Sequence, residues 1–307
     1  MEFLNRGCCI CGSKSLGELV LSARSPAESL PFSQLKRQWN GFFNDEVKEK
    51  SFFSYHRCRK CAVLFCPTFF SGEQLGRLYE NMADNTASVQ LQLLKKTQRG
   101  YFQCLKKHIQ PVSGDYFEMG PDIGLFTANV RDEGRFDHFW LAEPNKAVWG
   151  SLKETLKMQP HDLFADLMID DPIPDNTLGA AVLIHVLDHL LQPLEVLRHL
   201  RSKMKKNAIL LIVTHDESSL LAKTLNHRWP AYCLQHPQLY SPISMGVLLE
   251  EAGFKIREIK KSYNHFPLGY LINHLLWAIG IRKWTVPAMN LLQIPLKLGN
   301  IITVAST

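Results

Sequence analysis

The segment from residue 115 to residue 145 constrains the fold of this chain more than any other. It begins Asp-Tyr-Phe-Glu-Met-Gly-Pro-Asp-Ile-Gly-Leu-Phe, and residues 139–145 read Phe-Trp-Leu-Ala-Glu-Pro-Asn. We expect a strand before Gly120, a tight turn up to Gly124 and then a helix, followed by a second strand that ends before Glu143. A glycine turn between strand and helix, with an acid after the next strand, predicts a βαβ unit that binds a nucleotide cofactor.

A second segment helps to choose among nucleotide cofactors. Residues 179–193 read Gly-Ala-Ala-Val-Leu-Ile-His-Val-Leu-Asp-His-Leu-Leu-Gln-Pro. An apolar strand therefore ends before His185, and His189 follows one helical turn after His185. An amphipathic run to Met204 and an apolar strand over residues 208–213 then repeat the alternation of helix and strand.

Taken in this order, these features resemble the class I S-adenosylmethionine-dependent methyltransferases, over residues 113–307. In that family a glycine-containing first loop, an acid after strand two and a His-Val-Leu-x-His turn after strand four recur. The resemblance implies an α/β fold with a Rossmann-like, seven-stranded sheet whose last strand is antiparallel. A dehydrogenase shares the first loop, but nothing in its pattern predicts the turn that runs from His185 to His189.

The expected strands follow from the apolar runs. They cover residues 116–119, 138–142, a short run before Leu163, 180–184, 208–213, 254–259 and 300–305, with a helix over residues 244–252 that ends at Gly253. Ligands of such a sheet bind at the carboxyl ends of the strands. The sequence therefore predicts that Gly120, Glu143, Asp166 and His185 lie on one rim.

The resemblance also implies which residues hold the cofactor, S-adenosylmethionine. The cofactor-binding set is Glu118, Gly120, Asp122, Gly124, Glu143, Asp166, Leu167 and His185. Glu143 corresponds to the acid that binds the ribose, and Asp166 with Leu167 corresponds to the pair that contacts adenine. Asp122 replaces the middle glycine of the family loop. Aspartate tolerates left-handed backbone angles better than most residues, so we expect the turn to form; a cofactor-dead scaffold is the alternative.

Two pairs among the eight cysteines have the spacing of metal-binding knuckles. Cys8 and Cys11 form one Cys-x-x-Cys turn, and Cys58 and Cys61 form the other. Four thiolates complete a tetrahedral zinc site with no open position, so the ion is expected to be structural. In a reducing compartment this spacing favours a metal over a disulfide. Cys9 is then a bystander.

The second knuckle lies in Tyr-His-Arg-Cys-Arg-Lys-Cys-Ala-Val-Leu-Phe-Cys-Pro, residues 55–67. This stretch resembles the end of the zinc ribbon that precedes the methyltransferase domain of nucleotide-deoxysugar C-methyltransferases. Cys66 is expected to be a buried thiol, and the chain is expected to lack the extra C-terminal domain of those enzymes. The implied organisation is a zinc-ribbon domain over residues 1–70, a helical connector or lid over residues 71–112 and a methyltransferase domain over residues 113–307.

Histidines are the candidates for acid–base chemistry, because imidazole exchanges a proton near neutral pH. His236 follows Trp229 and Tyr232, rings that can stack on a substrate. It is either a base or substrate ligand, or a structural anchor of its loop. His185 either lines the cofactor pocket or acts as the base, and His215 is a further candidate.

His185 and His189 have the spacing of a metal-binding pair on a helix. In the zinc metalloprotease motif a glutamate directly follows the first histidine. Here Asp188 stands instead, at a different offset. A metalloprotease is therefore excluded, and we expect His189 to pack within a helix.

Composition favours a small-molecule acceptor, for example a nucleotide-linked sugar. A net charge of +6 suits an anionic compound but is far from the dense basic stripe of a nucleic-acid binder. The alternative is an RNA methyltransferase, because cations and phenylalanines alternate between Lys36 and Lys60 and could hold a single strand. Asp45, Glu46 and Glu49 interrupt that stretch, which favours an ordinary solvated surface. No pattern specifies an oligomeric state.

Targeting signals are also missing from the pattern of the sequence. The first seven residues carry charge and no apolar run follows them, which predicts no signal peptide. The most apolar stretch, residues 266–281, is broken by Asn273 and His274, so we expect a helix packed on the core rather than a membrane span. The sequence predicts a cytoplasmic enzyme.

Overall fold

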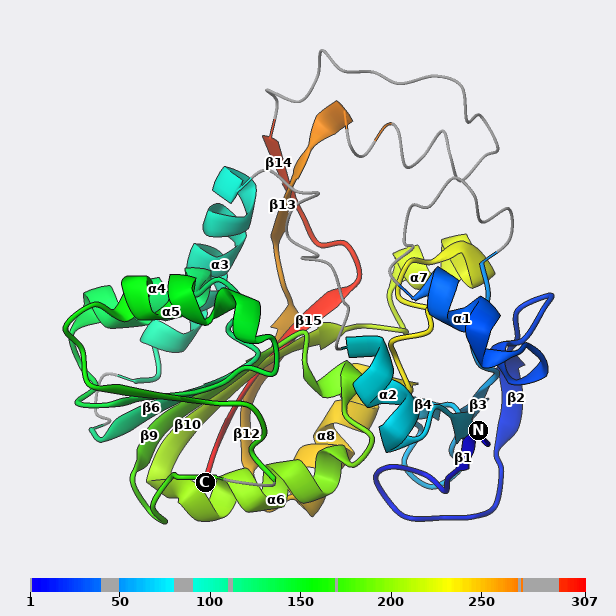
Figure 1. Cartoon of the computed structure of the whole chain (residues 1–307), viewed down its shortest axis with the longest axis horizontal. Helices are drawn as coiled ribbons and strands as arrows, with labels where there is room; N and C mark the ends of the chain where they lie inside the picture. The colour runs from blue at the N-terminus through cyan, green and yellow to red at the C-terminus, as the bar shows by residue number, and fades with distance from the viewer. Residues whose placement is uncertain are drawn as a thin grey trace.

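The computed structural model describes residues 2–39, 50–79, 91–109, 113–168, 171–269, 272 and 293–307. Two parts lie next to each other (Figure 1). One is a seven-stranded sheet with helices on both faces, and the other is a smaller part formed mainly by the N-terminal residues. We call residues 2–39 and 50–79 the cysteine module.

The large sheet has the strand order β12-β15-β10-β9-β6-β7-β8. Its strands are β6 (Asp115–Met119), β7 (Phe139–Ala142), β8 (His161–Phe164), β9 (Leu178–Ile184), β10 (Met204–His215), β12 (Lys255–Lys261) and β15 (Asn300–Ser306). The strands β10, β9, β6, β7 and β8 pair in parallel, whereas β15 is antiparallel to both of its neighbours. The expected α/β fold with an antiparallel last strand is confirmed, and every expected strand overlaps one of these seven.

Helices cover the two faces of this sheet (Figure 1). On one face lie α3 (Leu91–Lys106), α4 (Leu125–Glu133) and α5 (Trp149–Leu156), and on the other lie α6 (Pro193–Lys203) and α8 (Pro242–Glu251). Because the central strands are covered on both faces, β9 and residues 208–213 of β10 form continuous apolar runs instead of alternating ones. Ala180 and Ala181 in β9 are fully buried.

The cysteine module contains short elements around an aromatic core. They are β1 (Leu4–Asn5), β2 (Glu18–Leu21), the 3-10 turn Ala27–Ser29, α1 (Phe32–Gln38), β3 (Tyr55–Arg57), β4 (Leu64–Phe65), β5 (Thr68–Phe69) and α2 (Gly72–Tyr79). Phe52 and Phe53 are 1% and 0% exposed. These two rings pack inside the module and are not available to stack on an RNA base.

One strand of the module's sheet comes from the other half of the chain. The sheet has the order β11-β4-β3-β2, and β11 (Gln238–Leu239) pairs with β4 through Gln238↔Phe65 and Leu239↔Leu64. Next to this pair, Cys66 donates from its backbone N–H to the carbonyl of Pro237 (2.8 Å). Cys66 is fully buried, as expected. The segment before β11 is therefore held by the module.

An ion pair reinforces the same junction. Arg57 in β3 donates from Nη1 and Nη2 to the Glu217 carboxylate, at 2.7 and 3.0 Å. Glu217 follows β10 and precedes α7 (Leu220–Leu225) and the 3-10 turn Asn226–Arg228. The side chain of Glu217 is 6% exposed, so the bidentate pair is protected from solvent on one side.

The most apolar stretch of the sequence differs in part from its expected form. Residues 266 and 267 lie in strand β13 (Asn264–Pro267), which pairs with β14 (Gln293–Leu296), so a helix over the whole of residues 266–281 is wrong at its start. Most of the remaining residues of that stretch lie outside the described part of the chain. Among the described helices, none combines the length and the apolar character that a membrane crossing needs.

Candidate functional site

The first loop has the backbone of a ligand-binding turn. Gly120, Asp122 and Gly124 have φ angles of 67°, 50° and 79°, so alternate residues adopt the left-handed conformation. Asp122 takes this conformation in place of glycine, as expected. A Cβ atom on Gly120 would lie 2.6 Å from Cγ2 of Val186, which leaves room for glycine alone at this point.

The acid after β7 contacts this loop directly. Glu143 accepts from the backbone N–H of Asp122 through Oε2 (3.0 Å) and from that of Asn145 through Oε1 (2.8 Å). The residue is 6% exposed, and burial raises the pKa of its carboxyl. Two residues of the predicted cofactor set, 21 positions apart, thus meet at the rim of the sheet.

Glu118 lies inside the unit formed by β6 and α4. Its Oε2 accepts from the hydroxyls of Tyr116 and Thr127, both at 2.7 Å, and it is 2% exposed. Burial raises the pKa of Glu118 to about 7, against the opposing effect of the two hydroxyl donors. This geometry joins the strand before the loop to the helix after it.

Asp166 and Leu167 follow β8, next to the end of β7. Glu143 donates from its backbone N–H to the carbonyl of Phe164 (2.8 Å), which places the ends of the two strands side by side. Leu167 is 1% exposed, whereas Asp166 is exposed and accepts from the backbone N–H of Met168 (2.7 Å). The apolar member of the pair is buried and the acidic member faces solvent.

Four histidines form a continuous cluster of rings. The ring centroids of His185 and His215 are 4.8 Å apart, those of His215 and His236 are 4.8 Å apart, and those of His236 and His189 are 4.7 Å apart. His185 directly follows β9 and His215 ends β10. His189 closes the 3-10 turn Leu187–His189. The two histidines proposed for catalysis, His185 and His236, thus belong to one cluster and flank His215.

The buried carboxylate of Asp188 is hydrogen-bonded to this cluster. It is 0% exposed, and its Oδ2 accepts from Nδ1 (2.6 Å) and from the backbone N–H (3.1 Å) of His215. Burial raises the pKa of Asp188, but the hydrogen bond from His215 and the charges of the neighbouring histidine rings together outweigh this effect and lower the pKa to about 2. Burial lowers the pKa of His185 to about 3. Burial also lowers the pKa of His215, so the carboxylate of Asp188 lies beside two neutral imidazoles, those of His185 and His215.

His236 reaches the cluster from the loop before β11. Its Nδ1 lies 2.7 Å from the carbonyl of Ala231 and 3.4 Å from Sγ of Cys233, and the residue is 3% exposed. Burial lowers the pKa of His236. The charge and the hydrogen bond of Cys233 act in the opposite direction and contribute most to raising the pKa to about 9. The carbonyl contact fixes a proton on Nδ1, and at a pKa of about 9 the ring also carries a proton on Nε2 near neutral pH, which Nε2 can donate to a substrate.

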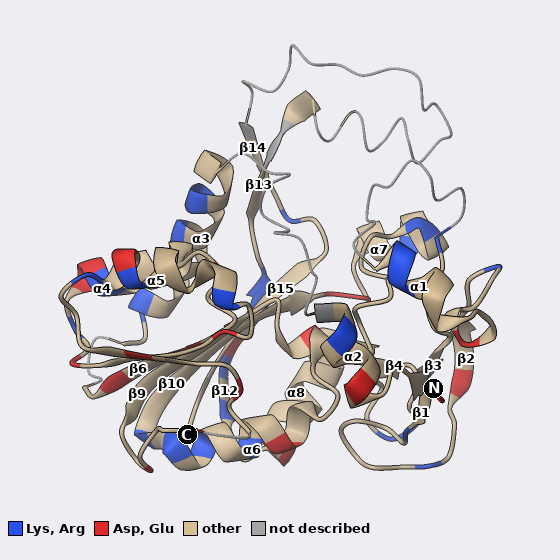
Figure 2. Cartoon of the chain, in the orientation of Figure 1, with Lys and Arg blue, Asp and Glu red and all other residues tan. Residues whose placement is uncertain are grey.

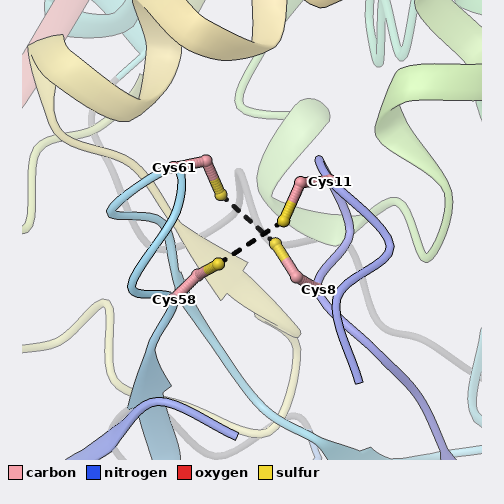
Figure 3. Close-up of side chains that lie close together, drawn as sticks. All are labelled: Cys8, Cys11, Cys58 and Cys61. Atoms are coloured by element: carbon pink, nitrogen blue, oxygen red, sulfur yellow. Dashed lines mark hydrogen bonds between the residues drawn. The ribbon is translucent and has the colours of Figure 1, made fainter. Parts of the chain in front are cut away.

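The four knuckle cysteines converge in the cysteine module (Figure 3). Sγ of Cys8 lies 3.3 Å from Sγ of Cys61, and Sγ of Cys11 lies 3.6 Å from Sγ of Cys58. All four sulfur atoms lie within 4.8 Å of one another, and Cys9 is not one of them. The hydrogen bond with Cys61 lowers the pKa of Cys8, and the same contact raises that of Cys61. This cluster could hold a metal ion.

The two knuckles have the same backbone form. The carbonyl of Cys8 accepts from the N–H of Gly12 (2.9 Å), and the carbonyl of Cys58 accepts from the N–H of Ala62 (3.0 Å). Gly12 and Ala62 have φ angles of 66° and 59°. Each pair of thiols is therefore presented by a tight turn that ends in a left-handed residue, before any ligand binds.

A separate cavity of about 520 Å³ lies at the other edge of the sheet. It is lined by Lys107, His108, Ser113, Lys205, Lys206, Asn207, Ile209 and Arg257. Most of these residues come before β6 or from the first half of β10, and Arg257 lies near the start of β12, so the cavity is at the amino ends of these strands. Ligands of parallel sheets bind at the carboxyl ends, and we do not assign this cavity to the site.

The charges of the described residues do not form a single basic face. Figure 2 shows Lys and Arg spread over several helices and strands, interspersed with Asp and Glu. Two of the cations that the sequence offered for RNA are engaged elsewhere: Arg57 pairs with Glu217, and Lys50 donates to the carbonyls of Trp229 and Pro230.

Two residues that contact the histidine cluster, Asp188 and Cys233, are not identified as site residues by the sequence alone. In the sequence, Asp188 stands out only as a departure from the metalloprotease motif, and Cys233 belongs to no recognisable motif. The available signal for Asp188 is its position three residues after His185, at the end of a strand whose neighbour ends in His215. Cys233 is identified only by its distance to His236.

The central part of the chain matches a known protein family. The sequence model described as "Methyltransferase domain" matches residues 90–259, which is more than half of the chain. None of the curated protein sequences matches at a significant level.

Several solved structures are similar to this one. The YcgJ protein from Bacillus subtilis is 13% identical, with a TM-score of 0.50, over 68% of this chain and 98% of that one. A SAM-dependent methyltransferase from Archaeoglobus fulgidus is 16% identical, with a TM-score of 0.47, over 77% and 100% of the two chains. Another, from Aquifex aeolicus, is 13% identical, with a TM-score of 0.45, over 67% and 88%. At such identities, the likeness to YcgJ shows the shared fold.

The buried Glu118 predicts how stability depends on pH. Between about pH 4.5 and about pH 7 the folded protein keeps a proton on Glu118 that the unfolded chain has released, so raising the pH through this window favours unfolding. The free energy of unfolding should lose about 3 kcal/mol from this group. In Glu118→Gln that contribution should vanish.

The measurement is urea unfolding of wild type and Glu118→Gln at a series of pH values. Glu154→Gln, a change of an exposed glutamate on α5, is the matched control and should follow wild type. If wild type and Glu118→Gln keep a constant difference across the window, Glu118 does not change its protonation there.

Proposed function

This chain belongs to the methyltransferase-domain family, and we propose that it moves a methyl group from S-adenosylmethionine to a small-molecule acceptor. The observation that carries the proposal is the contact between Glu143 and the loop at Asp122 (3.0 Å). It sets a buried carboxylate beside a turn with three left-handed residues, which suits a nucleoside with free ribose hydroxyls.

Each residue of the loop has a proposed part in holding the cofactor. Gly120 and Gly124 let the backbone approach it, Glu143 accepts from the ribose hydroxyls, and Leu167 covers the adenine beside Asp166. Glu118 acts from the interior, because its hydroxyl partners fix β6 against α4. His185 directly follows β9 and is proposed to line the pocket, next to Val186, which touches Gly120.

When bound, S-adenosylmethionine supplies a methyl group on a positively charged sulfur. In the transfer, a lone pair of the acceptor forms the new bond to carbon, and the electrons of the carbon–sulfur bond return to sulfur. The chain's own residues align the acceptor and receive its proton where it has one. We propose His236 as the histidine that contacts the acceptor, with His185 as the second candidate.

The loop before β11 is the proposed acceptor site. Its aromatic residues Trp229 and Tyr232 are packed against the cysteine module, where Tyr232 lies 5.4 Å from Tyr55 between ring centroids. Tyr55 also donates from its hydroxyl to the carbonyl of His236 (2.7 Å). The module thus holds the loop in one position, which favours a small, rigid acceptor such as a nucleotide-linked sugar.

Screening of acceptors tests the proposal as a whole. Purified protein is incubated with methyl-labelled S-adenosylmethionine and a panel of nucleotide-linked sugars, other anionic metabolites and total RNA. Transfer of label to a small molecule is the expected result. Label transferred only to RNA would support the alternative acceptor class, and failure to bind S-adenosylmethionine by calorimetry would support a cofactor-dead scaffold.

Glu143→Ala should weaken the binding of S-adenosylmethionine by at least about tenfold. The reason is the loss of charged hydrogen bonds to the ribose, each worth roughly 1.5–3 kcal/mol. Isothermal titration calorimetry measures the affinity, and Glu154→Ala on the exposed side of α5 is the control. Unchanged affinity in Glu143→Ala would move the cofactor to another place on the protein.

His236→Ala should lower turnover by about a hundredfold or more, because the acceptor loses its catalytic partner. The affinity for S-adenosylmethionine should stay the same. His227→Ala, an exposed histidine on the same connection, is the control. A parallel loss of melting temperature and acceptor affinity would mean that His236 anchors the loop, and normal turnover would exclude it from the mechanism.

We further propose that the four-cysteine cluster binds one structural zinc ion. The tight turns and the convergent sulfur atoms fit a tetrahedral thiolate site. Metal analysis of Cys58→Ser should show loss of this zinc together with lower thermal stability of the whole chain, since the module's sheet includes β11. Cys9→Ser is the matched control and should keep the metal; zinc retained in full by Cys58→Ser would contradict the ligand assignment.

A further inference from the structure

Three residues of the histidine cluster have the composition of a second metal centre. His185, Asp188 and His215 each offer one ligand atom, and these atoms lie within 4.8 Å of one another. They come from two neighbouring parallel strands: His185 and Asp188 follow β9, and His215 ends β10. The backbone fixes this proximity, because His185 donates from its N–H to the carbonyl of Val213 (2.9 Å).

Two atoms of this group lack the partners that buried polar atoms normally have. In the described part of the chain, neither Nδ1 of His185 nor Oδ1 of Asp188 has a hydrogen-bond partner, and both are buried. A buried carboxylate oxygen and a buried imidazole nitrogen without partners are costly to the fold. Their proximity indicates that a ligand of opposite charge completes the site.

The donor set selects the kind of ligand. Two imidazole nitrogens and one carboxylate oxygen bind divalent transition metals such as zinc, iron, manganese or cobalt, and leave coordination positions open. Bonds of about 2.1 Å would bring the ligand atoms to within about 3–4 Å of one another, so a contraction of about 1 Å is enough. An ion would also replace the proton that His215 shares with Asp188.

The backbone conformation of His185 is a further sign that the side chain is held in a particular direction. His185 has a φ of 53°, a left-handed conformation that a histidine rarely adopts. Such strain is retained where the surrounding structure requires a particular side-chain direction. Here it sets the ring beside that of His215, at 4.8 Å between centroids.

We propose that His185, Asp188 and His215 bind a divalent transition-metal ion at the acceptor side of the cofactor loop. His185 precedes Val186, whose Cγ2 lies 2.6 Å from the position of a Cβ on Gly120. The ion would therefore lie next to the proposed methyl donor, with open positions toward the acceptor. Its role rests on the proposed function: it would bind an acceptor hydroxyl and lower the pKa of that hydroxyl.

The fourth histidine serves as an internal control. His189 belongs to the ring cluster through His236 (4.7 Å between centroids) but not to the three-residue group. The sequence spacing of His185 and His189 suggested a pair on one helix, whereas the structure groups His185 with Asp188 and with His215 of the next strand. Metal binding should therefore depend on His185, Asp188 and His215 and not on His189.

Cobalt binding to the full-length protein tests the proposal. Metal-free protein is titrated with Co²⁺ and the bound equivalents are measured by dialysis and metal analysis. Wild type should bind about two equivalents, one of them in the cysteine cluster. His215→Gln and Asp188→Asn should weaken the other by more than about tenfold, while His189→Gln should retain both ions and Cys58→Ser should lose only the cysteine-bound ion.

A second measurement does not depend on variants that could fail to fold. Co²⁺-loaded wild type should show strongly shifted proton NMR signals of exchangeable imidazole N–H groups, which cysteine ligands cannot give. The absence of these signals, or a second equivalent that survives in folded His215→Gln, would overturn the site. Calorimetry with S-adenosylmethionine on the same samples distinguishes the metal site from the proposed function. If the second metal ion binds but S-adenosylmethionine does not, only the proposed function is rejected.

Discussion

The parallel pairing of β6, β9 and β10 is the constraint on which the rest of this structure depends. Parallel strands end at the same edge, so the three loops that follow these strands must meet there. The register Val213↔Ile184 between β10 and β9 places His215 beside His185. The register Met119↔Leu183 between β6 and β9 brings Gly120 to the same edge. The proposed cofactor loop at Gly120 and the histidine cluster are thus two results of one pairing pattern.

The cysteine module contributes to this edge although it lies outside the large sheet. It binds the segment from Trp229 to Leu239 through strand β11, through the Tyr55 hydroxyl and through the pair of Arg57 with Glu217. A loop with few contacts of its own would pay a large entropic cost to hold an acceptor. The module removes much of that freedom, so the proposed zinc ion would act directly on the proposed acceptor site.

Sequence patterns predicted the parts of this structure that depend on local order. Apolar periodicity predicts the strands, and with them the position of Glu143 after the second strand. The turn at Gly120 follows from residues that tolerate left-handed backbone angles, which include Asp122. The sequence did not predict three features that depend on packing: the contact of Cys233 with His236, the contact of Asp188 with His215, and the place of β11 in the module's sheet. These depend on register and packing between segments far apart in the sequence, which no local pattern encodes.

The histidine cluster lowers the stability of the fold. Each buried polar atom without a partner costs about 1–3 kcal/mol, and a net stability of only about 5–15 kcal/mol leaves little room for several of them at one point. The cluster places Nδ1 of His185 and Oδ1 of Asp188 in that condition, with a strained backbone at His185. Simple packing would favour apolar side chains here, as in β9, which ends directly before His185. A centre that binds a ligand through these atoms explains why the chain keeps them.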